Sequence, residues 1–302
     1  MKRETLKVKR QRTKDKKVTI RCQTPNTLFF AFFAGVMRLD IYLVNNGFFE
    51  SREKAVDAIR SGLVSLNGRV AAKPAVNVTD DCIVSVNSSM LLPYVSKGGL
   101  KLKRAVDVFG LDFSGLNVLD AGSSTGGFTD CCLQHGASHV WAVDVGTSQL
   151  HPSMHGNNRI TSVENTDIRS FPPSQLLFEP VDAIVGDLSF ISLRMVFPAL
   201  QSLLKPSGFA VLLIKPQFEA GAQHVGRTGI VTKPAVHNVV ISQVATAAAS
   251  NGFFLSRITH APIREAKKNI EYLALFTREN CPLPSYSNVV LEAFALQKSI
   301  KG

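Results

Sequence analysis

The stretch that decides the fold is LDAGSSTGGFTD, residues Leu119–Asp130. An apolar run leads into it, which predicts a strand, and the residues after its glycines predict a helix. Gly122 allows a sharp turn, while Gly126 and Gly127 let the backbone approach a ligand where the helix begins. No Lys-Ser or Lys-Thr pair follows the glycines, so the stretch is neither a Walker loop nor a GxGxxG fingerprint. The turn alone is compatible with any Rossmann-like fold.

Strand-like and helical segments alternate on either side of this turn and predict the class of fold. Helical stretches separate the first five predicted strands, which indicates a doubly wound, mostly parallel α/β sheet. The connection between the last two leaves no room for a helix, so we expect an antiparallel pair. Such a sheet resembles that of the class I (Rossmann-like) methyltransferases. The predicted strands are residues 117–122, 139–146, 160–165, 181–189, 209–215, 253–261 and 270–278.

A smaller α+β unit is predicted to begin at residue 37. A short helix ends at Asn46-Gly47, Ser51 is a candidate N-cap for a second helix, and Asn67-Gly68 is a strong hairpin signal. Basic residues interrupt these elements. On one face they would form a phosphate-contacting patch, and scattered they would be an ordinary solvated surface. The candidate RNA-binding residues are Arg38, Arg52, Lys54, Arg60 and Arg69.

The order of residues in this unit resembles the alpha-L RNA-binding motif. The similarity rests on Arg38-Leu39-Asp40, Gly47, Ser51 to Ala55, Ile59, Gly62 and Asn67-Gly68. That motif occurs in a ribosomal protein of the small subunit, in pseudouridine synthases and in tyrosyl-tRNA synthetases. The resemblance implies that the unit binds structured RNA.

The charge of the chain fits a polyanionic partner only in part. The 302 residues include 34 Lys and Arg against 23 Asp and Glu, a net charge of +11. Residues 2–17 alone carry +7, so the rest of the chain is only mildly basic. The five cysteines show no CxxC spacing, and we expect neither a metal site nor disulfides. A reducing, cytoplasmic location fits best.

Residues 1–36 form a separate basic extension. Its apolar run, TLFFAFFAGV at 27–36, is too short to span a bilayer. We interpret the extension as disordered, as a targeting segment, or as an over-long gene prediction. The remaining predicted divisions are an RNA-binding domain with its linker at 37–95, a methyltransferase domain at 96–280 and a C-terminal tail at 281–302.

Carboxylates at the predicted strand ends indicate the cofactor. Asp144 ends the second strand, where its carboxylate can accept from both hydroxyls of a ribose. Asp167 follows the third strand and could bond an adenine amino group. With Asp120 and the glycine turn, these residues resemble an S-adenosylmethionine site. Carboxylates also suit a sulfonium better than a pyrophosphate, although NAD remains an alternative on fold analogy.

Two neighbouring predicted strands deliver an acid and a lysine to one edge. Asp187 ends the fourth strand and Lys215 ends the fifth, in VLLIKPQFEAG, while Lys101 lies upstream and Glu271 opens the last strand. Each alone could be a cap, an ion-pair partner or a surface residue. Together they resemble the Lys-Asp-Lys-Glu tetrad of FtsJ-type ribose 2′-O-methyltransferases. A 2′-hydroxyl must lose its proton as it attacks, and a partly desolvated lysine beside a second cation can act as the base.

From about Met37 to Arg278 the order of motifs resembles the TlyA/hemolysin-A family, whose members are described as rRNA cytidine-2′-O-methyltransferases and also as haemolysins. The resemblance implies ribosomal RNA or ribosomal subunits as partners, S-adenosylmethionine as methyl donor and no stable membrane association. The interdomain LLPYVS lacks the Arg-x-Trp-Val of relatives. The implied catalytic residues are Lys101, Asp187, Lys215 and Glu271. The implied cofactor-binding residues are Asp120, Gly122, Ser124, Gly126, Phe128, Asp144 and Asp167.

Other functions remain open at this point. A haemolysin would need an amphipathic or long apolar element, which only Phe29 to Val36 approaches. A non-catalytic RNA-binding or ribosome-assembly factor would keep the fold without the chemistry. A base N-methyltransferase usually carries proline after the fourth strand, whereas this chain has DLSF.

Overall fold

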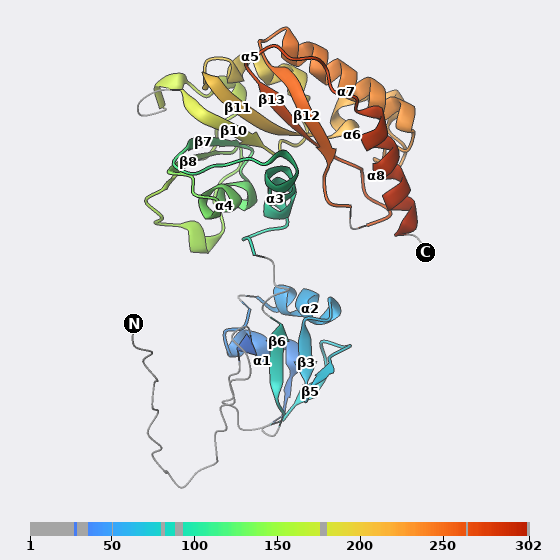
Figure 1. Ribbon diagram of the computed structural model, residues 1–302. Helices are drawn as coiled ribbons and strands as arrows, with labels where there is room; N and C mark the ends of the chain where they lie inside the picture. The colour runs from blue at the N-terminus through green and yellow to red at the C-terminus, as the bar shows by residue number, and fades with distance from the viewer. Residues whose placement is uncertain are drawn as a thin grey trace, which may run out of the picture. The chain divides into compact units, whose positions relative to one another are not determined.

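The computed structural model describes residues 27–28, 36–49, 51–79, 82–87, 93–175, 180–263 and 265–300. The chain divides into two compact units, the first ending at Leu91 and the second beginning at Leu92 (Figure 1). Each unit has its own buried core. Among the described residues, no helix is both long and apolar enough to cross a bilayer.

The first unit packs two helices against a small sheet. Helices α1 (Leu39–Asn45) and α2 (Arg52–Arg60) share an apolar core with strands β3 and β6 of the sheet β1-β6-β3-β4. The Ser51 hydroxyl caps α2 by accepting from the Lys54 backbone N–H at 3.2 Å, as predicted. Strands β2 and β5 form a separate antiparallel pair. The bounds are β1 Thr27–Leu28, β2 Met37–Arg38, β3 Val64–Leu66, β4 Arg69–Val70, β5 Asn77–Val78 and β6 Val84–Asn87.

Two local features of this unit follow from its sequence. Asn67 and Gly68 both have positive φ, 49° and 77°, and join β3 to β4 in the predicted hairpin. Strand β1 lies inside the predicted N-terminal extension and pairs with β6. The rest of that extension, apart from Val36, lies outside the described residues.

The second unit is built on a seven-stranded sheet in the order β12-β13-β11-β10-β7-β8-β9. Strands β7 to β11 run parallel, and β13 lies antiparallel between β11 and β12 (Figure 1). The predicted parallel sheet and its antiparallel pair are therefore confirmed. The bounds are β7 Asn117–Ala121, β8 His139–Val143, β9 Ile160–Val163, β10 Val181–Gly186, β11 Leu204–Ile214, β12 Phe254–His260 and β13 Tyr272–Thr277.

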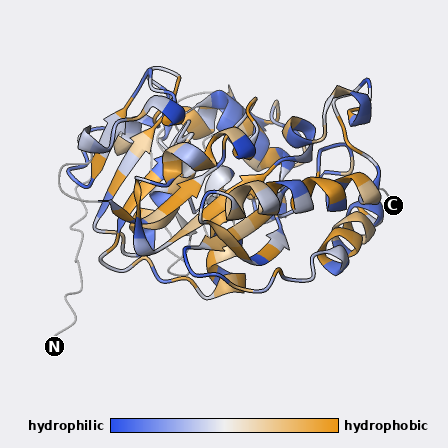
Figure 2. Ribbon diagram, turned by 90° about the horizontal axis from the view of Figure 1, so that it is seen from above, coloured by the Kyte–Doolittle hydropathy of each residue, from blue (hydrophilic) through white to orange (hydrophobic). Residues whose placement is uncertain are grey.

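Both faces of this sheet are covered. Val118 of β7 faces the core shared with α3 (Gly98–Phe109) and α4 (Gly127–Gln134). Leu119, its neighbour, faces the other core, shared with α5 (Phe197–Leu200), α7 (Pro234–Ala249) and α8 (Ser287–Ser299). Because both faces are buried, the sequences of the strands are continuous apolar runs. Figure 2 shows hydrophobic strands, coloured orange, at the centre.

The connections between the parallel strands are less helical than predicted. The β7–β8 connection holds a helix of eight residues, α4. Among the described residues, the β8–β9 and β9–β10 connections form only short 3-10 turns, and β10–β11 adds the four-residue α5. Pro152 and Pro173 begin two of these turns, a position at which the missing N–H of proline removes no hydrogen bond within the turn.

The segment at 281–302, predicted as a tail, contains α8. Its Val290 and Ala293 are fully buried in the core beneath α7. This helix therefore belongs to the packing of the second unit. One short helix, α6 (Pro216–Glu219), begins directly after β11 and carries residues of the site.

Candidate functional site

An ion pair joins the ends of two neighbouring strands. Asp187 follows β10 and Lys215 follows β11, and the two strands pair in parallel register. The Lys215 Nζ lies 2.7 Å from the Asp187 Oδ1. Lys215 is only 7% exposed. The strand order therefore places an almost buried amine beside a carboxylate at the edge of the sheet where doubly wound folds bind ligands.

Lys101 and Glu271 complete the predicted tetrad. Lys101, in the first turns of α3, contacts the Asp187 Oδ2 at 2.9 Å and the Glu271 Oε2 at 2.8 Å. Glu271 directly precedes β13. Four residues from separate elements thus form one continuous chain of charges in the order Lys215, Asp187, Lys101, Glu271.

The charges in this chain stabilise one another. Burial alone would lower the pKa of the Lys101 amine, but the nearby Asp187 and Glu271 outweigh it and the pKa is raised. Burial acts to raise the pKa of Asp187, and the two lysines reverse this and lower it. Lys101 therefore stays protonated at neutral pH, and the lowered pKa of Asp187 makes its carboxylate a weak base, so neither is suited to take a proton from a substrate.

Two residues in the loop after β10 join this site although sequence reasoning missed them. The Lys215 amine donates to the Ser189 Oγ at 2.7 Å and to the Asp187 carbonyl oxygen at 3.4 Å. Phe190 has a φ of 63° and is 91% exposed. Its ring contacts that of Phe218, with centroids 5.2 Å apart. The motif DLSF carries both residues, but only the tertiary structure reveals that Phe190 is held outward.

A buried carboxylate fixes the loop that carries Ser189 and Phe190. Glu219 of α6 accepts from the Ser192 hydroxyl at 2.6 Å and from the Leu193 backbone N–H at 2.7 Å. The Arg194 guanidinium lies 3.3 Å from the same carboxylate. Since α6 begins immediately after Lys215, these bonds join the segment of the lysine to the loop of Asp187.

The glycine-rich turn after β7 lies at the same edge of the sheet. The Asp144 carboxylate accepts from the backbone N–H groups of Ser124 and Gly146, each at 2.8 Å. Gly122 and Gly126 have φ of 77° and 85°. A Cβ on Gly126 would lie 2.4 Å from the Met154 sulfur. Glycine is therefore favoured there mainly by the left-handed backbone conformation, and the Met154 side chain would have to shift for a larger residue.

Asp120 lies beneath this turn and is fully buried. Its Oδ2 accepts from the Thr129 hydroxyl at 2.6 Å, and its Oδ1 has no hydrogen-bond partner among the described residues. Burial, supported by the charges of Asp187 and Asp144, raises the pKa of Asp120 to about 7. Three acidic side chains therefore influence one another near the end of β7.

Two other predicted cofactor residues have contacts within the protein in this structure. Phe128 is buried in the core between α3 and α4. The Asp167 carboxylate accepts from the Arg169 backbone N–H and guanidinium, which holds the pKa of Asp167 below its usual range. The contact of Asp167 with an adenine and of Phe128 with a cofactor therefore stay predictions.

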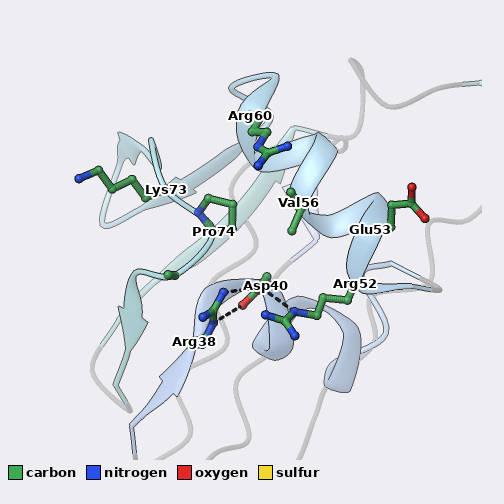
Figure 3. Close-up of a pocket in the computed structure, with 9 residues that line it drawn as sticks. Arg38, Asp40, Arg52, Glu53, Val56, Arg60, Lys73 and Pro74 are labelled. Carbon is green, nitrogen blue, oxygen red and sulfur yellow. Dashed lines mark hydrogen bonds and ion pairs between the residues drawn. The ribbon is translucent and has the colours of Figure 1, made fainter.

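The predicted RNA-binding residues of the first unit fall into two groups. Figure 3 shows Arg38 and Arg52 pointing toward Asp40, which is fully buried. Asp40 accepts from Arg38 at 3.0 and 2.9 Å and from Arg52 at 2.7 Å. The hydrogen bond from Arg38, with that from Arg52, lowers the pKa of Asp40 to about 2 despite its burial.

A surface hollow of about 520 Å³ surrounds this pair of arginines. Arg60 and Lys73 also line it (Figure 3). Lys54 and Arg69 do not line it. The structure thus brings three of the five predicted residues together and adds Lys73, whereas Lys54 and Arg69 lie elsewhere on the unit.

Comparisons with known proteins agree with both units. The model of the FtsJ-like methyltransferase family matches residues 94–278, and that of the S4 domain matches residues 37–81. The "16S/23S rRNA (cytidine-2'-O)-methyltransferase TlyA" of Mycobacterium tuberculosis is 38% identical over 78% of this chain and 87% of its own. "Hemolysin A" of Brachyspira hyodysenteriae is 38% identical over 80% of this chain and 99% of its own.

A solved structure shares the architecture. The "Putative hemolysin from Streptococcus thermophilus" is 36% identical, with a TM-score of 0.67 over 88% of this chain and 97% of that one. The family model covers all the site residues from Lys101 to Glu271. This chain belongs to the FtsJ-like methyltransferase family and carries an S4 domain ahead of its catalytic unit.

Proposed function

We propose that this protein uses S-adenosylmethionine to methylate the 2′-hydroxyl of a cytidine in ribosomal RNA. The observation that carries the proposal is the chain of charges from Lys215 through Asp187 and Lys101 to Glu271. It supplies an amine with little exposure to water beside a carboxylate that stays ionised. The substrate class is that of the cytidine-2′-O-methyltransferase relatives.

The residues at the strand ends fit S-adenosylmethionine. Asp144 retains carboxylate lone pairs for ribose hydroxyls while holding the glycine turn. The free Oδ1 of Asp120 and the nearby acids favour a cationic group. When bound, the methyl donor supplies an electrophilic carbon attached to sulfonium. The protein holds the acceptor hydroxyl and removes its proton.

We assign the base role to Lys215. An alcohol is a weak nucleophile, and an amine that accepts its proton during methyl transfer removes this obstacle. Asp187 and Lys101 position the amine, and Glu271 compensates the charge of Lys101. Phe190, which presents an exposed ring beside this centre, is our candidate for stacking against a base of the RNA.

The S4 domain would hold the RNA through phosphate contacts. Arg38 and Arg52 share one buried carboxylate, so their guanidinium groups lie in fixed positions beside a hollow. Ribosomal RNA or a ribosomal subunit is the partner we propose, and the cytoplasm is the corresponding location.

The experiment uses ribosomal subunits or rRNA from cells that lack the gene. These are incubated with the full chain and methyl-labelled S-adenosylmethionine, and the product is mapped for ribose methylation. We expect a cytidine 2′-O-methyl group that is absent with Lys215→Ala. Methylation on a base would contradict the proposal. Binding of S-adenosylmethionine without transfer to any RNA would favour an assembly factor instead.

A further inference from the structure

The Lys215 amine donates two hydrogen bonds and forms one close ion pair. It donates to the Ser189 Oγ at 2.7 Å and to the Asp187 carbonyl at 3.4 Å, and it pairs with the Asp187 Oδ1 at 2.7 Å. A protonated lysine has three N–H groups and no acceptor. Once the amine is neutral, its lone pair takes one of the directions in which the ammonium can donate, and the short contact with the Ser189 Oγ lies along one of them.

Only one of the three partners can supply a proton in return. The Asp187 carbonyl and the ionised Asp187 carboxylate can only accept, whereas a serine hydroxyl both donates and accepts. When Lys215 is neutral, its two remaining N–H groups can point toward Asp187, one of them to the carbonyl oxygen. Its lone pair then accepts from the Ser189 hydroxyl.

Exposure places Ser189 between the amine and a substrate. Lys215 is 7% exposed, whereas Ser189 is an exposed residue in the loop next to Phe190. Among the described residues, none accepts a hydrogen bond from the Ser189 hydroxyl, which itself accepts from Lys215. A ribose arriving from solvent therefore meets the Ser189 oxygen before it meets the lysine nitrogen.

We propose that Ser189 is a catalytic residue that relays the proton of the 2′-hydroxyl to Lys215. This inference rests on the proposed function and adds a residue that sequence reasoning did not single out. The relay requires a hydroxyl that contacts both the substrate oxygen and the lysine amine.

Methyl transfer and the two proton transfers form one step that conserves atoms and charge. The 2′-oxygen forms a bond to the methyl carbon as the carbon–sulfur bond breaks, and the electron pair of that bond stays on sulfur. The 2′-hydroxyl proton passes to the Ser189 Oγ while the Ser189 proton passes to the Lys215 Nζ. The positive charge thus moves from sulfonium to ammonium, and the hydroxyl of Ser189 is restored. The product state is the hydrogen-bond arrangement seen in this structure, with the ammonium donating to serine.

The test measures single-turnover methylation by the full chain, from neutral to alkaline pH, for wild type, Ser189→Ala and Ser189→Thr. We expect the methylation rate of Ser189→Ala at the alkaline plateau to be about 100-fold below that of the wild type, the usual contribution of a positioned acid–base group. Ser189→Thr keeps the hydroxyl and should recover most of the rate. In mixtures of light and heavy water, the wild-type rate should follow a two-proton dependence.

A merely structural role for Ser189 predicts different results. If Lys215 took the proton directly, Ser189→Ala would have the wild-type rate at the alkaline plateau. The wild-type rate in mixtures of light and heavy water would then show a one-proton dependence. Ser192→Ala provides a matched control, because it removes the bond from the same loop to Glu219 but no proton path. A loss with Ser192→Ala as large as that with Ser189→Ala would assign the effect to loop disorder and overturn the relay.

Failure of the relay is separable from failure of the proposed function. A wild-type chain that forms no 2′-O-methyl product would refute the function itself. A wild-type chain that forms it, with an unchanged plateau for Ser189→Ala, would refute only the relay. Calorimetry with S-adenosylmethionine on each variant verifies that the domain is folded.

Discussion

The Asp187 Oδ1 and the Lys215 Nζ lie 2.7 Å apart at the ends of two adjacent parallel strands, β10 and β11. A second ion pair, Asp182 with Lys205 at 2.8 Å, joins the same two strands near their beginnings. The chain therefore contains its own control. The two pairs share residue types and strands, but only Asp187–Lys215 is connected to Lys101 and Glu271.

Replacing Lys215 with alanine should abolish methyl transfer and leave S-adenosylmethionine binding intact, because the amine is the proposed proton acceptor. The measurement is methyl incorporation into rRNA, together with calorimetric binding of the cofactor. Lys205→Ala removes the lysine at the other end of the strand and should retain activity. Comparable turnover in the two variants would refute the assignment of Lys215.

Replacing Asp187 with asparagine should destabilise the protein, because Lys215 is almost buried and loses its counter-charge. We expect a loss of about 3 kcal/mol in the free energy of unfolding by urea at neutral pH. Asp182→Asn should cost less, since that pair is more exposed.

The stabilisation by Asp187 should depend on pH in a defined direction. Its pKa in the folded protein lies below the ordinary value of 3.8. The contribution is therefore complete above that value and lost as the pH falls through the folded pKa. The difference in stability between wild type and Asp187→Asn should shrink on acidification in that window. A difference that stays constant with pH would contradict this electrostatic account.

Replacing Asp40 with asparagine separates positioning from net charge in the S4 domain. The substitution adds one positive charge, so simple electrostatics predicts tighter RNA binding. If Asp40 instead holds Arg38 and Arg52 in place, binding should weaken about tenfold, the equivalent of one charge-assisted hydrogen bond. Asp57→Asn on the exposed side of α2 adds the same charge and should not weaken binding. Filter binding of rRNA fragments at fixed salt distinguishes the two outcomes.

Replacing Phe190 with alanine should lower kcat/KM for RNA by about tenfold to a hundredfold, the contribution of one stacked base. Affinity for S-adenosylmethionine should not change. The substitution should not lower the melting temperature, because the ring is exposed. Phe190→Tyr should retain activity. Leu291→Ala, which removes an exposed apolar side chain on α8, is the control; an equal effect there would argue against stacking.

Much of the fold could be predicted because its signals are local. Apolar runs and the glycines at 122 and 126 marked the strands and the first turn, and Ser51 and Asn67-Gly68 marked a helix start and a hairpin. The helices between parallel strands were overestimated. Local propensity does not reveal which connections form a full helix, because tertiary context overrides it, as in the described residues between β8 and β9.

By itself the sequence determined that Asp187 and Lys215 would reach one edge of the sheet, because each follows directly after a strand and parallel strands share that edge. The tertiary structure alone decided that Lys101 and Asp187, 86 residues apart, would share a hydrogen bond, and that Glu271 would pair with the same lysine. It also decided that Lys215 would be buried behind an exposed Ser189, and that Arg38 and Arg52 would converge on Asp40. Periodicity and turn chemistry act over a few residues, whereas burial and charge pairing depend on which distant elements pack together.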